Sequence, residues 1–398
     1  MNVDLGPARV PGFRFAGVSA GLKKAFGALD LGLIAADRVC SAASVNSANK
    51  VKAAPVYVTI DRLRSGRLQA VVANSGCANS FTGKPGLRLA IESCKVVARE
   101  MGIAPELVAP SSTGVIGHLY DFDKFSAGAR AAVASLSDDA MENFARAIMT
   151  TDTRPKMASA RVRIGGKTVT VAGIAKGSGM IAPHMATMLA YVVTDAAAAA
   201  PRLRGALKAA LPSSFNAITV DGDMSTNDSV VLMAGGAAGN GAMNRRDVDA
   251  FNGAVRAVCE ALATELVRDG EGATKLVTIK VIGARSAGDA ERCARQIANS
   301  PLVKTAFFGC DPNVGRILMA AGSSGAAVDS ERLVLYIGGV KVAARGMLMV
   351  DALEAAAARM REREFEVRLD LRLGRAGATI LTCDLSYEYV KINAEYTT

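Results

Sequence analysis

Apolar and polar positions follow two patterns along the chain, one typical of strands and one of helices. Strand patterns lie at 54–60, 69–75, 107–117 (a strand entering a glycine loop), 159–174 (two strands about Gly165-Gly166), 188–193, 277–284, 333–346, 365–373 and 379–396. Helical spacing of apolar residues occurs at 87–101, 123–135, 138–150, 200–210, 246–267, 289–300, 313–322 and 351–364. The mixture predicts an α/β (α+β) protein with antiparallel sheet.

The last third of the chain has an α/β pattern of its own. We therefore expect a boundary near 275–280, with a larger domain at 1–275 and a smaller one at 276–398. Polar clusters fall in the predicted loops, where functional residues concentrate. They are SSTG at 111–114, TTDT at 150–153, DGDMSTND at 221–228 and DGEG at 269–272.

Charge changes this picture only slightly. The net charge is +10, but Lys and Arg are spread along the chain and no nucleic-acid-binding motif accompanies them. This favours a mildly basic enzyme that attracts small anions, with no nucleic-acid partner. The chain has no apolar run long enough to span a bilayer, and its start lacks the pattern of a signal peptide, so we expect a cytoplasmic protein without a membrane partner.

Metal and thiol chemistry find little support in the sequence. The seven cysteines are scattered singly without metal-ligand spacing, and the two histidines, His118 and His184, are far apart. We expect reduced thiols, no metal and no cofactor.

One threonine stands in an unusual setting. Thr187 opens a predicted strand after a loop that is rich in glycine and contains Pro183. By itself this is a structural threonine, because Thr favours strands. Cleavage of the Ala186–Thr187 bond would change its chemistry, because the freed α-amine has a pKa of roughly 7.7–8.0 and could accept the hydroxyl proton.

Nine sequence motifs, which follow one another along the chain, carry a resemblance to a known family. They are NKVKAAPV at 49–56, NSGCANSFTG at 74–83, SSTGVIG at 111–117, AIMTTDT at 147–153, KGSGMIAPHMATML at 176–189, ITVDGDMSTNDSVV at 218–231, VRDGEGATK at 267–275, DPNVGRIL at 311–318 and INAEYTT at 392–398. In these motifs the chain resembles the ornithine acetyltransferase (glutamate N-acetyltransferase) family of arginine biosynthesis. The resemblance implies an N-terminal-nucleophile-like layered sandwich of sheets flanked by helices, with a smaller C-terminal α/β domain.

The resemblance also implies a site. The chain would cut itself between Ala186 and Thr187 into fragments 1–186 and 187–398, and Thr187 would be the nucleophile. Thr113 and Gly114 would form the oxyanion hole. The substrate-binding residues would be Thr153, Lys176, Thr187, Glu271, Asn393 and Thr398. The last of these would require the C-terminal tail to return to the active site.

The implied reaction is ping-pong acetyl transfer from N-acetylornithine to glutamate through acetyl-Thr187. The fragments would stay together as an α2β2 assembly. The sequence leaves open whether acetyl-CoA is also a substrate, which would allow N-acetylglutamate to be made afresh. His184 and Val314 stand where the family usually has Asn and Trp, so substrate preference also stays open.

Three alternatives remain at this stage. A self-cleaving amidase or aminopeptidase would use water in place of glutamate. A paralogous acyltransferase would act on a related acyl amino acid. A non-catalytic basic binding protein would remain one intact chain.

Overall fold

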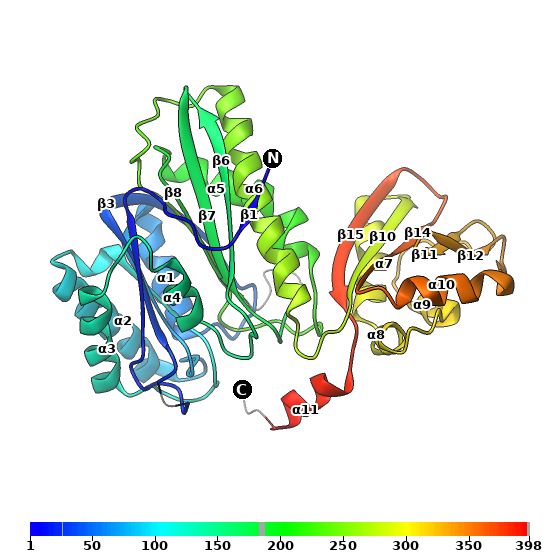
Figure 1. Cartoon of the computed structure of the whole chain (residues 1–398), viewed down its shortest axis with the longest axis horizontal. Coiled ribbons are helices and arrows are strands. Elements are labelled where there is room, and N and C mark those ends of the chain that lie inside the picture. Colours follow the sequence, from blue (N-terminus) through cyan, green and yellow to red (C-terminus); the bar gives the residue numbers. More distant parts are fainter. Residues whose placement is uncertain (26, 183–187, 396–398) are drawn as a thin grey trace. The chain divides into compact units, whose positions relative to one another are not determined.

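The long strand β3 (Leu31–Asn46) joins two halves of a nine-stranded sheet in the computed structural model, which describes residues 1–25, 27–182 and 188–395 (Figure 1). One end of β3 pairs with β2 and β4, and the other end pairs with β9. The sheet runs in the order β1-β6-β7-β8-β9-β3-β4-β5, with β2 beside β3. The other strands are β1 (Asp4–Leu5), β2 (Phe13–Val18), β4 (Arg67–Asn74), β5 (Val108–Ser112), β6 (Lys156–Ile164), β7 (Lys167–Lys176), β8 (Leu189–Thr194) and β9 (Ser229–Ala234).

Helices cover this sheet in layers. Alternate residues of β3 and β4 pack against α1, α2 and α3, and the opposite faces of these strands share an apolar cluster with β7, β8 and β9. Helix α4 contributes to that cluster, α5 contacts β3 and β9, and α6 lies over Gly173 of β7. The helices are α1 (Ala54–Arg62), α2 (Gly83–Met101), α3 (Phe122–Ala134), α4 (Met141–Ala147), α5 (Ala200–Ala210) and α6 (Arg245–Arg268). This layered α/β sandwich confirms the predicted fold class.

The chain divides into two units. Among the described residues, unit 1 lies within Met1–Asn216 and Asp223–Leu266, and unit 2 lies within Ala217–Gly222 and 267–395. Unit 2 has a six-stranded sheet in the order β13-β12-β11-β14-β10-β15. Its strands are β10 (Leu276–Ala284), β11 (Val334–Ile337), β12 (Val340–Ala344), β13 (Met347–Leu348), β14 (Glu364–Asp370) and β15 (Ala376–Cys383). Its helices are α7 (Ala287–Asn299), α8 (Pro301–Phe308), α9 (Val314–Gly322), α10 (Leu353–Met360) and α11 (Tyr387–Glu395).

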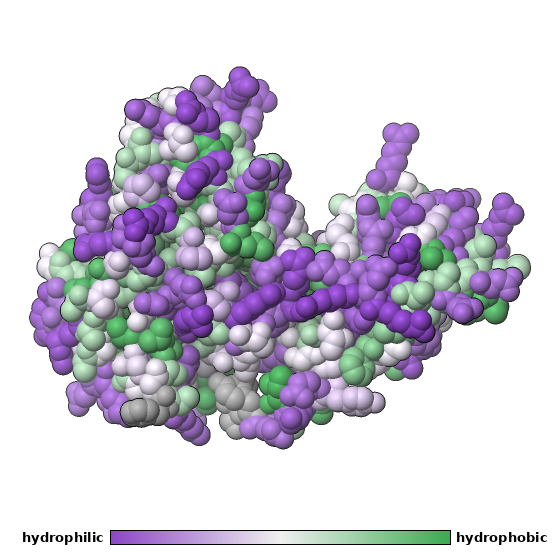
Figure 2. Space-filling model, viewed as in Figure 1, coloured by the Kyte–Doolittle hydropathy of each residue, from purple (hydrophilic) through white to green (hydrophobic). Residues whose placement is uncertain are grey.

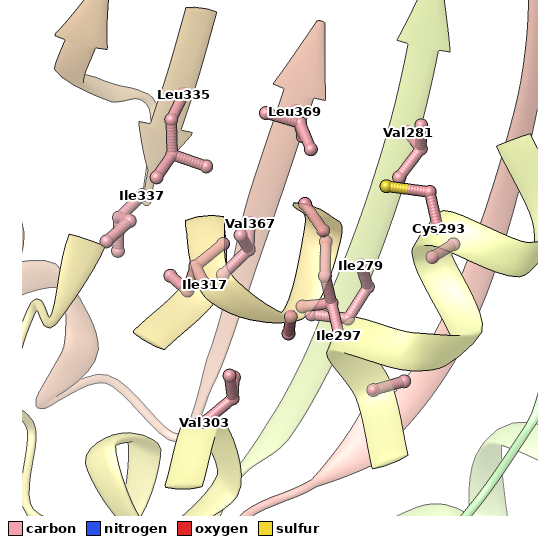
Figure 3. Packing of buried hydrophobic residues seen from close by; sticks show 14 of the residues in the cluster. Ile279, Val281, Cys293, Ile297, Val303, Ile317, Leu335, Ile337, Val367 and Leu369 are labelled. Atoms are coloured by element: carbon pink, nitrogen blue, oxygen red, sulfur yellow. The ribbon is translucent and has the colours of Figure 1, made fainter. Parts of the chain in front are cut away.

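Unit 2 is built around an apolar core. Ile279 and Val281 of β10 and Val367 and Leu369 of β14 face Ile297 of α7 and its neighbours on α8 and α9 (Figure 3). These side chains are almost fully buried. Their burial drives the helices onto the sheet, because removing apolar surface from water is favourable by about 25 cal/mol per Å².

Two predicted elements were wrong. Residues 54–60 form helix α1 and not a strand. The β-branched residues of this segment favour a strand. However, Pro55 occupies the first turn of the helix, a position that suits proline. The Thr59 hydroxyl also donates to the Pro110 carbonyl of β5 at 2.7 Å. The strand expected at 379–396 ends at Cys383, and residues 387–395 form α11. Ser386 precedes α11, and its hydroxyl accepts from the Tyr389 amide.

On the face shown in Figure 2, hydrophilic residues cover most of the surface and apolar residues lie in small patches. None of the helices in 1–25, 27–182 and 188–395 is long and apolar enough to cross a membrane. The same residues include no His, Cys, Asp and Glu group suited to a metal ion, and all seven cysteines are free.

Candidate active site

Lys176, the last residue of β7, lies at the centre of a buried polar cluster in unit 1. It is 5% exposed. Its ammonium donates to the Thr150 hydroxyl at 2.7 Å and to the Thr113 hydroxyl at 3.3 Å. The structure therefore brings together Thr113 and Lys176, two predicted site residues that are 63 positions apart in the sequence.

The Asp152 carboxylate forms an ion pair with the Lys176 ammonium. This carboxylate lies 3.8 Å from the Lys176 ammonium and 2.6 Å from the Lys156 ammonium, and it accepts from the Gly177 and Thr150 amides. Burial alone would raise the pKa of Asp152, but Lys176 and then Lys156 outweigh burial and hold the pKa below its usual range. The carboxylate is ionised and is shared by two ammonium groups, so these three side chains keep a net positive charge.

Lys23 adds to this positive charge. It lies beside Gly76, and its pKa is lowered by burial and also by Lys176, while Asp30 and Asp152 act in the opposite direction. We call Lys23, Thr113, Thr150, Asp152, Lys156 and Lys176 the charged cluster.

The loop after β5 presents two donors near Lys176. Gly114 has φ +124°, and a Cβ there would lie 2.5 Å from the Gly76 carbonyl carbon, so only glycine fits. The Thr113 amide donates to the Asn74 carbonyl at 3.0 Å. The Gly114 amide makes no hydrogen bond with the described residues, and the Thr113 hydroxyl accepts from Lys176, so its own proton is available.

Buried amides hold this loop in place. Asn227 donates to the Ala78 and Ser112 carbonyls at 2.7 and 2.8 Å. The Ser112 hydroxyl donates to the Asn74 side chain at 2.6 Å, and Asn74 donates to the Cys77 carbonyl at 2.9 Å. Segments 74–78, 112–114 and 225–228 are thus joined by bonds that leave little freedom to move.

In unit 2 two more predicted site residues meet. Asn393 of α11 donates to the Glu271 carboxylate at 2.7 Å. The Ser386 hydroxyl donates to the Gly272 carbonyl at 2.6 Å, which ties the start of α11 to the DGEG loop. Glu271 is 6% exposed, whereas Asn393 is exposed.

Other predicted residues lie elsewhere. Thr153 is exposed, although Asp152 beside it is buried. Val314 begins α9 and contributes to the apolar core of unit 2. Ala186, Thr187, His184 and Thr398 lie outside the described residues.

Sequence reasoning did not single out Lys23, Asp152 or Lys156, nor Asp228, which stands just before β9 and is 1% exposed. Asp152 and Asp228 stand inside the quoted motifs TTDT and STND, so their motifs were marked but their roles were not. Nothing local in the sequence marks Lys23 or Lys156, because the burial of a lysine depends on tertiary contacts.

A layered α/β sandwich with a buried lysine beside a hydroxyl and a free glycine amide has the features of an enzyme site rather than a passive binding surface. The comparison with known families identifies it further: the chain belongs to the ArgJ family, whose model matches residues 14–398. This confirms the resemblance and decides against a non-catalytic binding protein.

Individual relatives agree with the family match. The chain is 50% identical over 393 residues to the arginine biosynthesis bifunctional protein ArgJ of Symbiobacterium thermophilum, covering 97% of each chain. It is 48% identical to the protein of that name from Geobacter sulfurreducens, covering 98% of this chain and all of the relative. A crystal structure of ArgJ from Bacillus halodurans is 42% identical, with a TM-score of 0.50 over 52% of this chain and 98% of that one.

Proposed function

We propose that the chain is a glutamate N-acetyltransferase of arginine biosynthesis, which moves an acetyl group from N-acetylornithine to glutamate through acetyl-Thr187. The family and the names of the relatives support a role in arginine biosynthesis. The observation that carries the mechanism is the Lys176 ammonium, buried and bonded to the Thr113 hydroxyl beside the free Gly114 amide.

Self-cleavage would begin with the Thr187 hydroxyl attacking the Ala186 carbonyl. The resulting ester would be opened by water, leaving a free α-amine on Thr187. That amine would then accept the hydroxyl proton when Thr187 attacks the acetyl group of N-acetylornithine. Ornithine leaves, and glutamate takes the acetyl group in the second half of the reaction.

Thr113 and Gly114 would stabilise the oxyanion that forms in each attack. A hydroxyl and an amide provide two donors, each typically worth about 2.7–4 kcal/mol at such a site. The hydrogen bond from Lys176 supports this role in two ways. It polarises the Thr113 hydroxyl, and it occupies the hydroxyl oxygen so that the hydroxyl proton can be donated to the oxyanion. We therefore expect Thr113→Val to lower kcat by about 10²-fold, while Thr113→Ser keeps the donor and most of the activity.

The positive charge of the charged cluster would attract substrate carboxylates. Lys176 would pair with one of them, with Thr153 also contacting the substrate. In unit 2, Glu271 and Asn393 would receive the amino-acid end of the substrate together with Thr398. The fragments would remain associated as α2β2 in the cytoplasm, and acetyl-CoA is a further donor to test.

The intact mass of the purified protein tests the cleavage. The wild type should give two fragments that meet between Ala186 and Thr187, whereas Thr187→Ala should remain whole. Thr168→Ala, which changes an exposed threonine of β7, is the matched control and should be cut normally. A wild type that remains whole and is active would exclude the mechanism.

Ornithine release from N-acetylornithine separates transferase from amidase. Release by the transferase should depend on glutamate after one turnover, because acetyl-Thr187 waits for its acceptor. Steady release without glutamate would instead favour the amidase or aminopeptidase alternative. Replacing N-acetylornithine by acetyl-CoA in the same assay tests the second donor.

A further inference from the structure

Two adjoining pockets on unit 2 are lined mainly by charged side chains, most of them cationic. One has a volume of about 430 Å³, and its charged lining residues are Glu331, Arg332, Lys341, Arg345 and Arg372. The other, of about 540 Å³, shares Arg332 and adds Arg285 and Asp329. Pockets of this size hold small molecules, and an excess of cations attracts anionic ones.

Few carboxylates neutralise these cations. Arg332 lies 3.4 Å from the Asp329 carboxylate, and Arg372 lies 3.7 Å from the Asp370 carboxylate. Both pairs are exposed and contribute little stability, so an anionic ligand can replace either carboxylate at small cost. Three further cations make no side-chain hydrogen bond or ion pair with the described residues: Arg285, Lys341 and Arg345. The two pockets therefore keep a net positive charge.

Backbone strain is concentrated in the smaller pocket. Among the described residues, six that are not glycine have a φ in the left-handed region, and two of the six are arginines. These two are Arg345, with φ +54°, and Arg372, with φ +53°, and both line the 430 Å³ pocket. The conformation is unfavourable for a residue with a Cβ, and residues strained in this way cluster at functional sites.

Solubility alone does not explain a strained arginine. An exposed cation acts on solubility from any surface position, so it needs no strained backbone. At the turn that contains Arg345, asparagine or glycine would meet the positive φ without strain. The turn is also closely packed, because a Cβ on Gly346 would lie 2.6 Å from a Glu331 carboxylate oxygen. The chain therefore presents an arginine from a constrained turn at a cost in stability, as a binding residue would require.

The two pockets are far from the predicted site residues of unit 2. Arg285 follows the end of β10, whereas the DGEG loop with Glu271 precedes the start of β10. The Thr274 hydroxyl donates to Asp384, which follows the β15 residue paired with Leu276, so the loop stays at that end. The nine residues of β10 separate its two ends by about 30 Å. A ligand of the pockets is therefore distinct from the amino-acid substrate that Glu271 is proposed to bind.

The type of cation indicates the type of anion. A guanidinium group matches phosphate oxygens with two parallel hydrogen bonds. Two pockets that meet at Arg332 provide separate positions for two phosphate groups. We propose that these two pockets, which we call the arginine pockets, bind a small molecule that carries a diphosphate group. This inference goes beyond the acetyl transfer and does not depend on it.

Isothermal titration of the wild type with inorganic pyrophosphate and with ADP, in phosphate-free buffer, tests the proposal. We expect one saturable site per chain and an affinity that falls as salt is added, because salt screens exposed charges. Equal affinities would show that the phosphates alone are recognised, and tighter binding of ADP would show that the ligand is a nucleotide; both results support the proposal. Absence of binding of both probes at low salt would overturn it.

Arg345→Asn removes one guanidinium and also the strain of its turn. We expect the affinity for pyrophosphate to fall by at least about 10-fold, as for the loss of a hydrogen bond between charged groups. Because asparagine suits the turn, the variant should be at least as stable as the wild type, so weaker binding cannot be ascribed to unfolding. Lys341→Gln, which leaves both strained arginines in place, should weaken binding by a similar factor.

Arg361→Asn is the matched control. Arg361 is an exposed arginine of unit 2 that lines neither pocket. Its replacement makes the same change in charge and should leave the affinity within about twofold of the wild type. Equal weakening by Arg345→Asn and Arg361→Asn would overturn the proposal, because the overall positive charge would then attract the probes. Binding of anionic lipid vesicles or of an oligonucleotide without binding of pyrophosphate or ADP would overturn it as well.

Discussion

In unit 1, the side chains of Asp152 and Lys156 are completely buried and joined by an ion pair of 2.6 Å, whereas the core of unit 2 is made of apolar side chains such as Ile279 and Leu369 (Figure 3). The apolar core gains stability in proportion to the area that it buries. The ion pair gains little overall, because the cost of desolvating two charges largely offsets their attraction. Stability therefore accounts for the apolar core but does not account for the charged cluster.

The two regions should also differ in how they fail. A shortened apolar side chain leaves a cavity whose cost increases with its volume. A lost carboxylate leaves buried ammonium groups without compensation, and that cost does not depend on size. The following predictions test this difference.

Asp152→Ala should have the largest effect. It removes the partner of Lys156 and Lys176 and the acceptor of the Gly177 amide. We expect the free energy of unfolding in urea to fall by about 3–5 kcal/mol. Asp139→Ala, which removes an exposed carboxylate paired with Arg9, should leave the urea midpoint nearly unchanged. Equal losses in both variants would contradict the distinction between buried and exposed pairs.

Ile279→Ala should cost about 3 kcal/mol and Ile279→Val about 1 kcal/mol, because the cavity in the unit 2 core grows with each methyl group removed. The same urea titrations measure this. The charged cluster should show no such gradation: Asp152→Asn nearly conserves volume yet should lose most of what Asp152→Ala loses. A small loss in Asp152→Asn would mean that packing, and not charge, holds the cluster together.

The sequence allowed much of the fold to be predicted. The hairpin β6–β7 and helices α2, α3, α7 and α9 follow from periodicity because one face of each is buried and the other is not. Helix α1 was missed because its valines and threonine favour strands, and its contact with β5 through Thr59 joins residues that are far apart in the sequence. Helix α11 was missed because the start of the helix is tied to the DGEG loop by a hydrogen bond from Ser386 to Gly272. These two residues are far apart in the sequence.

The candidate site was less accessible to sequence reasoning. Thr113 and Lys176 were expected together only because their motifs resemble a family. Asp152 and Asp228 show why the rest was missed: each is an aspartate in a polar loop, and both are buried by contacts with distant segments. Lys176 and Lys156 lower the pKa of Asp152 against the effect of burial, whereas burial raises the pKa of Asp228, and no local pattern contains that information.

The pH dependence of stability separates these two aspartates. Asp152 has a lowered folded-state pKa, so its stabilisation is present above the unfolded pKa of about 3.9 and is lost as the pH falls through the folded value. Asp228 has a raised folded-state pKa, so stability is lost as the pH rises above about 3.9, by about 1.4 kcal/mol per unit, until the folded carboxyl ionises.

The Thr187→Ala protein, which we expect to remain whole, provides the measurement for Asp228. Its free energy of unfolding, compared between pH 4 and 6 with that of the double variant Thr187→Ala/Asp228→Asn, should decline more steeply because only the single variant loses the Asp228 proton on unfolding. Apolar variants such as Ile279→Val should shift the whole curve without changing its slope. Parallel curves for the single and double variants would show that Asp228 is ionised in the folded chain.

Arg345→Asn should have the smallest effect, and it should be stabilising. Arg345 and Gly346 join β12 to β13 with φ values of +54° and +70°, as in a type I′ turn, which favours Asn-Gly. The other hairpin turn of this sheet, Gly338-Gly339, meets the same requirement with two glycines. Arginine is strained in this conformation, and Arg345 makes no hydrogen bond or ion pair with the described residues that would compensate.

We expect Arg345→Asn to raise the free energy of unfolding by about 1 kcal/mol. Arg361→Asn, at an exposed arginine of the same unit with φ −71°, is the control and should not be stabilising. Strain at an exposed turn can be relieved without loss, whereas Gly114 must keep its positive φ because the loop beside Lys176 depends on it. If Arg345→Asn lowers stability, the arginine side chain has a role at this turn that outweighs its backbone strain.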